Sequence, residues 1–299
     1  MGTPEFAVPG LSRLIAATEF EIIGVYTQPD KPVGRQQALT SPPIKELALK
    51  HGLKIFQPEK IRPETENIKS LKPDLIVVIA YGKIIPQDIL DIPTFGCINV
   101  HASLLPKYRG AACLNAPILN GDSETGVTIM RMEAGLDTGP ILRQNKIKLS
   151  GSETLADVHD ALSELGATAL IPTLLDFVAG KITPQAQDDT KASYVKTLKK
   201  EDGRIDINKG AAEIERLVRA YNPWPGTYLE IGSATLKLIA VEHVIAELNK
   251  VEPGQLFMDG DRLILQCRQN ALVILRLQLA GKKSMSANEF INGYKSLIK

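Results

Sequence analysis

The sequence predicts a doubly wound, mostly parallel α/β sheet followed by a small β-barrel, and three observations support this prediction. Short apolar runs alternate with longer helix-like segments through the first half, at 21–27, 74–80 and 96–100. A polar stretch without clear periodicity follows at 183–200. Short apolar runs with glycine-containing turns fill the remainder. Strands separated by helices favour a parallel sheet covered on both faces, whereas short strands joined by turns favour an antiparallel barrel.

The first domain is expected to cover residues 1–182. Its strands are the three apolar runs, because each is short and rich in valine and isoleucine. A helix is predicted after Ser152, a suitable N-cap residue, because apolar side chains then recur at helical spacing. These side chains are Leu155, Val158, Leu162 and Leu165. We expect this helix to serve in packing, and we assign its His159 no chemistry.

The second domain is expected to follow a linker. The stretch at 183–200 is rich in glutamine, aspartate and lysine and has no clear periodicity, which is typical of a linker. Residues 201–299 are predicted to form the second domain, beginning with a short helix at 211–221. Its strands are expected at 227–231, 235–241, 263–266 and 272–279.

Composition is compatible with two ordinary hydrophobic cores. The 299 residues include 44% hydrophobic ones, which is enough for two domains. The three cysteines, Cys97, Cys113 and Cys267, form no Cys-x-x-Cys pattern, so neither a disulfide framework nor a zinc site is indicated. The N-terminus shows no export signal, and no apolar run reaches the ~18 residues of a membrane span. We therefore expect reduced thiols, a cytoplasmic location and no bound metal.

Charge is unevenly distributed, although the net charge is only +1. Residues 1–190 carry 18 basic and 22 acidic side chains, a net charge of −4. Residues 191–299 carry 17 basic and 12 acidic side chains, a net charge of +5. Because such an imbalance is also common on solvated surfaces, it favours contact of the C-terminal part with a polyanion only modestly.

The stretch GCINVHASLLPKYRG at 96–110 is the strongest candidate for a functional site. Asn99 and His101 are two residues apart on an apolar strand, so both side chains project from one face. Ligands bind at the C-terminal ends of strands in open α/β sheets, and Pro106 keeps the following loop near that edge. The pair is therefore predicted to face a bound ligand.

These residue types suit the attack of a nitrogen nucleophile on a carbonyl. Asn99 can donate an N–H to the oxygen that becomes negative, and His101 can carry protons near neutral pH. Asp137, in a glycine-flanked acidic loop at 132–140, can hold the imidazole and favour its charged form. Taken singly, each residue also fits an ordinary structural role in a turn, a cap or a core. Together at two strand ends, they favour a catalytic site.

Two long segments resemble the formyltransferase family that uses 10-formyltetrahydrofolate. They are INVHASLLPKYRGAA at 98–112 and GDSETGVTIMRMEAGLDTGPIL at 121–142. The resemblance implies a Rossmann-like first domain and a second domain related to the oligonucleotide-binding (OB) fold. It also implies that Asn99, His101 and Asp137 are catalytic, that 10-formyltetrahydrofolate is the formyl donor, and that no metal takes part. The formyl group would pass directly to the acceptor amine through a tetrahedral intermediate.

A reduced folate is a flat pterin with donors and acceptors on its edge, and a narrow cleft lined by main-chain groups can bind it. Two loops are expected to line such a cleft, because each leaves the C-terminal end of a strand. The first contains Tyr81, Gly82 and Ile84, and the second is Ser103, Leu104, Leu105 and Pro106. From the residues alone, both loops also fit as ordinary strand-to-helix turns.

Five further segments are similar to the members of this family that formylate the initiator tRNA in translation initiation. They are GTPEFAVP at 2–9, VYTQPDKPVGR at 25–35, SPPIKELA at 41–48, YNPWPGTY at 221–228 and LQLAGKKSMSANEFINGY at 277–294. In these members the loop that matches 29–43 contacts the acceptor end of the tRNA, which implies that Arg35 and Lys31 bind tRNA. We expect Lys282 and Lys283 in the basic second domain to contact phosphates, and we expect a monomer.

The sequence departs from the family pattern in two places. Where the family usually has Pro, an aliphatic residue and Gln, this chain has Cys113, Leu114 and Asn115, so its fine specificity stays open. The family also has a short apolar strand ahead of the GTPEF segment. Because the first strand of a doubly wound sheet lies centrally, we expect a strand rich in Val, Ile, Leu or Phe upstream of Gly2.

Other functions compete with this interpretation. Glycinamide ribonucleotide formyltransferases share the three catalytic residues but have no equivalent of the C-terminal domain. Sugar-nucleotide formyltransferases and the hydrolase part of formyltetrahydrofolate dehydrogenase carry a similar extra domain, and the loop around Arg35 and the segment 277–294 argue against them. A non-catalytic RNA-binding protein would have no need of Asn99, His101 and Asp137 together.

Overall fold

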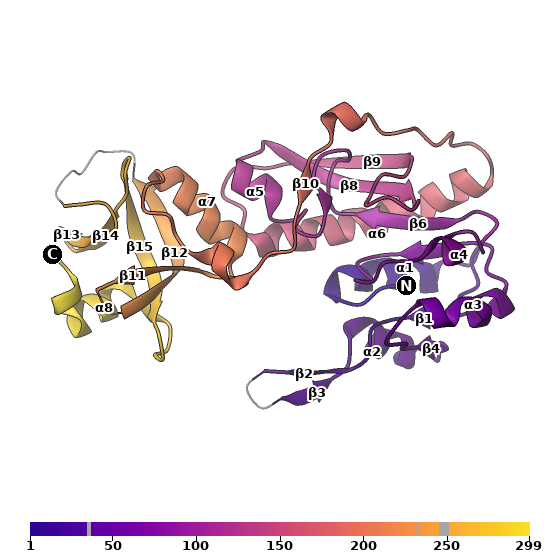
Figure 1. Cartoon of the computed structure of the whole chain (residues 1–299), viewed down its shortest axis with the longest axis horizontal. Helices are drawn as coiled ribbons and strands as arrows, with labels where there is room; N and C mark the ends of the chain where they lie inside the picture. Colours follow the sequence, from indigo (N-terminus) through magenta and orange to yellow (C-terminus); the bar gives the residue numbers. More distant parts are fainter. Residues whose placement is uncertain (35–36, 233, 245–250) are drawn as a thin grey trace. The chain divides into compact units, whose positions relative to one another are not determined.

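A computed structural model describes residues 1–34, 37–232, 234–244 and 251–299 (Figure 1). The chain forms two compact units. The first unit consists of Met1–Cys113, Glu124–Lys148 and Asp157–Val195, and the second consists of Leu114–Ser123, Leu149–Ala156 and Lys196–Lys299. Each unit is therefore assembled from segments that are not contiguous in sequence, and the first unit extends to Val195, well into the stretch that is predicted to be a linker.

The main sheet of the first unit has a parallel side and an antiparallel side. Its strands, in spatial order, are β5 (Ile76–Val78), β6 (Cys97–His101), β8 (Glu124–Arg131) and β9 (Ile141–Lys148). β5 and β6 are parallel, whereas β6 with β8 and β8 with β9 are antiparallel. The parallel pair β5–β6 matches the predicted Rossmann-like sheet. β8 and β9 extend this sheet as an antiparallel hairpin, because the loop between them is too short for the crossover that parallel strands need.

Met1 and Gly2 lie between two parallel pairs of this unit. β1 (Val25–Tyr26) pairs with β4 (Ile55–Phe56), and the Gly2 N–H donates to the Tyr26 carbonyl at 3.0 Å. On the other side Gly2 forms a parallel bridge with Ile79. The Met1 amine donates to the Val77 carbonyl at 2.6 Å, as an N–H of a parallel strand would. These two residues thus occupy the central position in which a first strand is predicted.

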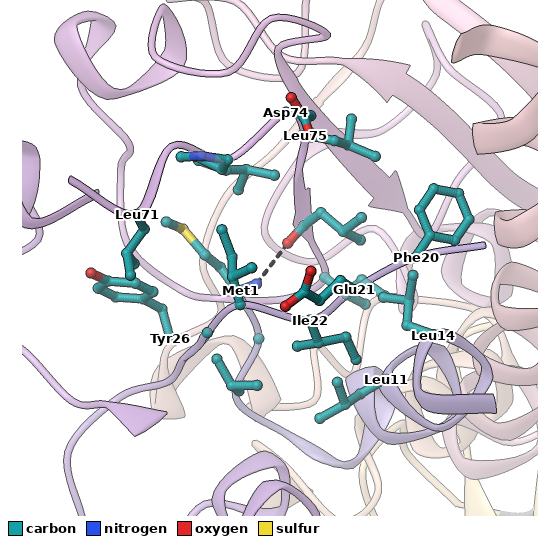
Figure 2. A pocket seen from close by; sticks show the side chains of 18 of the residues that line it. Met1, Leu11, Leu14, Phe20, Glu21, Ile22, Tyr26, Leu71, Asp74 and Leu75 are labelled. Atoms are coloured by element: carbon teal, nitrogen blue, oxygen red, sulfur yellow. Dashed lines mark hydrogen bonds between the residues drawn. The ribbon is translucent and has the colours of Figure 1, made fainter. Parts of the chain in front are cut away.

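A cavity of about 420 Å³ adjoins this position (Figure 2). Its walls are mainly apolar and come from the loops at 19–24 and 72–75 and from the neighbouring helices and strands. They include Met1, Leu11, Leu14, Phe20, Ile22, Tyr26, Leu71 and Leu75, and the charged lining residues are Glu19, Glu21, Lys72 and Asp74. Figure 2 shows the Met1 amine directed at a carbonyl oxygen beside this space. None of the predicted site residues is among the lining residues of the described chain.

Helices cover the sheet of the first unit, and α6 is the longest. Its bounds are Leu155–Val178, so it begins where the sequence predicts. Gly166 lets it approach β6 closely, since a Cβ added there would lie 2.8 Å from Val100 Cγ1. The Ser163 hydroxyl donates to the Phe6 carbonyl at 2.9 Å. α6 is long and apolar enough to cross a membrane, but its buried residues and these contacts show that it is a core helix of the first unit.

The other elements of the first unit are short. Its remaining helices are η1 (Glu5–Ala7), α1 (Val8–Ala16), α2 (Pro43–Lys50), η2 (Arg62–Glu64), α3 (Thr65–Leu71), α4 (Gln87–Leu90) and η3 (Asp189–Lys191). Its remaining strands form two pairs: β2 (Lys31–Val33) is antiparallel to β3 (Ala38–Thr40), and β7 (Arg109–Gly110) is parallel to β10 (Tyr194–Val195). β10 lies within the stretch predicted to be a linker, and it pairs with the last two residues of the stretch 96–110.

The second unit contains a six-stranded antiparallel sheet where the sequence predicts a short helix and a small β-barrel. Its order is β11-β12-β15-β14-β13, with β16 on β15. The strands are β11 (Thr227–Ile231), β12 (Ala234–Val244), β13 (Leu256–Asp259), β14 (Arg262–Gln266), β15 (Ala271–Leu279) and β16 (Met285–Ser286). Within the described residues the pairings run from β11 to β13 without a closing pair, so the sheet is OB-like in its antiparallel order rather than a closed barrel there.

Helices pack against this sheet and complete the second core. They are α5 (Ala116–Asn120), η4 (Lys200–Gly203), α7 (Ala211–Tyr221), α8 (Ala287–Gly293) and η5 (Lys295–Leu297). Ile214 and Val218 of α7 and Phe290 of α8 are buried in one cluster with the strand residues. Asn115 donates to the Ala220 carbonyl at 2.7 Å, which ties the start of α5 to α7. The departure from the family pattern at Asn115 therefore lies at a packing contact of the second unit.

Candidate active site

β6 presents the two residues on which the functional prediction depends. Asn99 lies between Val78 of β5 and Met130 of β8 in the sheet register, and its side chain is half-buried. Its carboxamide has no hydrogen-bond partner among the residues that the structure describes. His101, two residues further along the same face, is buried, with an exposed fraction of 6%. An amide with unused donors thus stands beside a buried imidazole at the end of the strand.

The hydrogen bond of His101 decides which ring nitrogen is available for chemistry. Nε2 lies 3.0 Å from the Tyr108 carbonyl oxygen. Because a carbonyl only accepts, Nε2 carries the proton and Nδ1 is the unprotonated nitrogen of the neutral ring. Nδ1 lies 3.7 Å from Asp137 Oδ2. The ring therefore offers Nδ1 as a proton acceptor, with a carboxylate close enough to stabilise the imidazolium.

Asp137 is held in an unusual backbone conformation in the loop between β8 and β9. Its φ is +53°, in the left-handed region, which Asp tolerates better than most residues. Its Oδ2 accepts the Gly110 N–H at 2.8 Å. Position 139 must be glycine, because the Cβ of any other residue would lie 1.8 Å from the Arg131 carbonyl oxygen. The glycines around Asp137 thus allow the close turn that brings its carboxylate toward His101.

A buried arginine supports both partners of this pair. Arg109, with an exposed fraction of 1%, lies on β7 between Tyr108 and Gly110, whose main-chain groups bind the imidazole and the carboxylate. Its guanidinium contacts three side chains from the segment after α6: Gln187, Asp189 and Tyr194. These three residues are absent from the predicted site, because a polar stretch without periodicity carries no signal for a contact 78 or more residues away.

The loop Ser103–Pro106, predicted to bind folate, follows β6 and is anchored by side chains of β8 and β9. Thr128 Oγ1 donates to the Ser103 carbonyl at 2.7 Å and accepts the Leu105 N–H at 3.0 Å. Gln144 donates to the Leu105 carbonyl at 2.8 Å. These main-chain groups are therefore already paired within the protein. Leu104 and Pro106, both half-buried, are the parts of the loop that remain accessible.

The other loop predicted to bind folate follows β5. Because β5 and β6 are parallel neighbours, the loops after them leave the same edge of the sheet. The main-chain carbonyl of Tyr81 accepts a hydrogen bond from the Gln28 side chain at 3.0 Å. The phenol of Tyr81 is buried, and this burial raises its pKa to about 12. Gly82 has a φ of +76°, and a Cβ there would collide with Gln28. Ile84 is 92% exposed and offers an apolar surface at this edge.

The residues predicted to bind tRNA lie on separate elements. Lys31 is exposed on β2, and its Nζ is 2.5 Å from Gln28 Oε1. Arg35 lies outside the described residues. Lys282 and Lys283 are exposed in the turn between β15 and β16 of the second unit. Lys31 belongs to the first unit, and the two turn lysines belong to the second.

The cysteines have no nucleophilic part in this site. Cys97, Cys113 and Cys267 are buried and form no disulfide among the described residues. Burial raises the pKa of Cys97 and of Cys267 to about 12, which leaves the thiolate form rare at neutral pH. Among the described residues, no group of three or more His, Cys, Asp or Glu side chains is placed to hold a metal ion.

Both units match known protein families. The formyl transferase family matches residues 1–174, and the formyl transferase C-terminal domain family matches residues 197–295. Solved structures share the fold. They include an N-formyltransferase from Helicobacter canadensis in complex with folinic acid and dTDP-3-aminofucose, with a TM-score of 0.69, 19% identity and coverage of 91% of this chain and 96% of that one. The fold and the family matches are those of a two-domain formyl transferase.

Curated relatives narrow the class. The methionyl-tRNA formyltransferase of Geobacter metallireducens is 48% identical over 98% of this chain and 94% of its own length. That of Pseudomonas syringae is 46% identical over 97% of this chain and 92% of its own length. The chain belongs to the methionyl-tRNA formyltransferase family.

Proposed function

We propose that this protein transfers the formyl group of 10-formyltetrahydrofolate to the α-amino group of initiator methionyl-tRNA. The observation that carries the proposal is the constellation at the end of β6: Asn99 with unused donors, and His101 beside Asp137. It supplies an oxyanion donor and a proton acceptor, which formyl transfer to an amine requires. The near-full-length identity to enzymes of this name supports the acceptor.

The reaction is a direct displacement at the formyl carbon. The neutral α-amine attacks that carbon, and a new C–N bond forms as the carbonyl electron pair moves to oxygen. Asn99 donates an N–H to this oxygen. His101 Nδ1 accepts the proton that the amine loses and delivers it to the folate nitrogen as the original C–N bond breaks. Formyl-tRNA and tetrahydrofolate leave, and the protein returns to its starting protonation state.

Asp137 makes the histidine suitable for this relay. The 3.7 Å between Oδ2 and Nδ1 is close enough for electrostatic stabilisation of the imidazolium. The Tyr108 carbonyl holds the other nitrogen, so the ring cannot turn away while it carries the extra proton. The pair therefore combines a fixed ring with a nearby counter-charge.

We place the two substrates on different surfaces. The folate lies against the loops after β5 and β6, where Tyr81, Gly82, Ile84 and the segment Ser103–Pro106 share one sheet edge. The tRNA contacts Lys31, Arg35, Lys282 and Lys283. A catalytic domain at 1–182, a linker at 183–200 and a tRNA-binding domain at 201–299 would divide these tasks. The enzyme acts as a monomer in the cytoplasm, where its thiols stay reduced.

The acceptor is tested by competition among amines. Purified protein with 10-formyltetrahydrofolate is given charged initiator tRNA, glycinamide ribonucleotide or an aminosugar nucleotide, and formylated product is measured for each. We expect formylation of the tRNA. Preference for either small acceptor would overturn the proposed function.

The site is tested by substitution in the same assay. His101→Ala and Asn99→Ala should each lower formyl transfer by ~10² or more, with folate binding kept, because each removes a group that acts in the transition state. His51→Ala, an exposed histidine at the end of α2, is the matched control and should keep full activity. Near-normal turnover of either site variant would remove that residue from the mechanism.

A further inference from the structure

Gln187 uses both ends of its carboxamide to join the Asp137 loop to Arg109. Its Oε1 accepts from Arg109 Nε at 3.1 Å and from Nη2 at 2.8 Å. Its Nε2 donates to the carbonyl oxygens of Asp137 at 2.8 Å and of Gly139 at 2.7 Å. Every polar atom of this side chain is thus engaged.

The orientation of the carboxamide follows from the chemistry of its partners. A guanidinium only donates, so the atom facing Arg109 must be the oxygen. Carbonyl oxygens only accept, so the atom facing Asp137 and Gly139 must be the nitrogen. No other neutral side chain of this length presents an acceptor to one neighbour and two donors to the other.

These contacts close a ring of hydrogen bonds around the catalytic pair. Arg109 lies between Tyr108, whose carbonyl holds His101, and Gly110, whose N–H holds the Asp137 carboxylate. Gln187 connects the Arg109 guanidinium to the backbone of Asp137 itself. The carboxylate and the imidazole are therefore positioned from one rigid segment, although they come from different loops. Asp137 needs such support, because its left-handed backbone is intrinsically unfavourable.

Arg109 is in turn fixed independently of Gln187. Its Nη2 donates to Asp189 Oδ1 at 2.7 Å, and its Nη1 donates to the Tyr194 hydroxyl at 2.9 Å. The β7–β10 pairing adds main-chain bonds, among them Arg109 N–H to the Ser193 carbonyl at 2.8 Å. Loss of Gln187 would therefore release the Asp137 loop and leave the arginine in place.

We propose that Gln187 is a positioning residue for formyl transfer, which acts by holding the Asp137 carboxylate at its distance from His101. This proposal rests on the catalytic role proposed above for Asp137. Gln187 touches neither substrate in this scheme. It affects the rate through Asp137 alone, so its removal should lower kcat and leave the KM for both substrates nearly unchanged.

The variant Gln187→Glu separates the two functions of the side chain. It keeps an acceptor for Arg109, strengthened by charge, and it replaces the N–H donors with an oxygen that repels the two carbonyl groups. We expect kcat to fall roughly tenfold, within the ~10² that a displacement of about 1 Å can cost. Gln187→Leu, which is neutral and similar in size, is measured as a second variant. If one variant fails to fold, the other still tests the proposal.

A double-mutant cycle identifies the route of the effect. Each substitution is made in the wild-type chain and in an Asp137→Asn background. We expect Gln187→Glu to lower kcat in the first and to change it less than about twofold in the second, since its target is already lost. Gln185→Ala, two residues away and exposed, is the matched control and should leave kcat unchanged.

The outcomes distinguish this proposal from the function on which it rests. An equal fold-loss in both backgrounds would show that Gln187 acts independently of Asp137 and would overturn the proposal. Normal kcat in both Gln187 variants, with a slow Asp137→Asn enzyme, would overturn it and leave the site assignment standing. A normal rate for Asp137→Asn would remove the catalytic role of Asp137 and this proposal with it.

Discussion

At the scale of single residues, the chemistry of the site depends on which polar atoms the fold has already used. Nε2 of His101 is bonded to Tyr108, so Nδ1 remains for proton transfer. The Ser103 carbonyl and the Leu105 N–H are bonded to Thr128, so the Leu105 N–H is already used within the protein. Residue type alone names the candidates, and only the partners of each atom show what it can do.

At the scale of elements, the site depends on a close approach between α6 and β6. Gly166 faces Val100, which lies between Asn99 and His101 on the strand, so the helix supports the strand from the opposite face. Valine is stiff about χ1 and cannot turn aside easily. The helical pattern of leucines predicts α6, but it does not show that a glycine makes the contact.

We predict that Gly166→Ala destabilises the protein by ~1–3 kcal/mol, the usual cost of overpacking, despite the better helix propensity of alanine. The matched control is Gly293→Ala in α8, where an added Cβ has no heavy atom within 4 Å. That variant should be neutral or slightly stabilising. Thermal or urea unfolding of both variants gives the comparison. An unchanged free energy of unfolding for Gly166→Ala would show that α6 and β6 can move apart at little cost.

At the scale of the whole molecule, basic charge is concentrated in the part of the chain that follows residue 190. In the second unit, the turn that carries Lys282 and Lys283 is held firmly. Gln278 donates to the Lys282 carbonyl at 2.6 Å, and Arg276 donates to Ser284 at 2.9 Å. Both lysines therefore project from a defined surface with their charges exposed to solvent.

If these lysines contact tRNA phosphates, their removal should change the salt dependence of binding. Each phosphate contact contributes roughly one to the slope of log K against log salt, so Lys282→Ala with Lys283→Ala should flatten the slope by about two. Lys60→Ala, an exposed lysine of the first unit, serves as the control. Filter binding of initiator tRNA over a range of salt provides the slopes. Equal slopes for the double variant and the wild type would exclude phosphate contact at this turn.

The sequence alone predicted the main strands and helices and the candidate site residues Asn99, His101 and Asp137. Alternating apolar runs predict the strands because burial of apolar side chains sets the local period, and the motif at 96–110 predicts Asn99 and His101 on one face. These are local properties, read over a few neighbouring residues. The likeness to known formyltransferases added the two substrates.

Only the tertiary structure decided how distant segments meet. The polar stretch at 183–200 has no periodicity, yet Gln187 and Tyr194 bind Arg109, 78 and 85 residues away. The orientation of β8 and the left-handed turn at Asp137 likewise follow from contacts between separate segments. A polar side chain carries no mark of its future partner, because hydrogen bonds are satisfied equally by water until the fold excludes it.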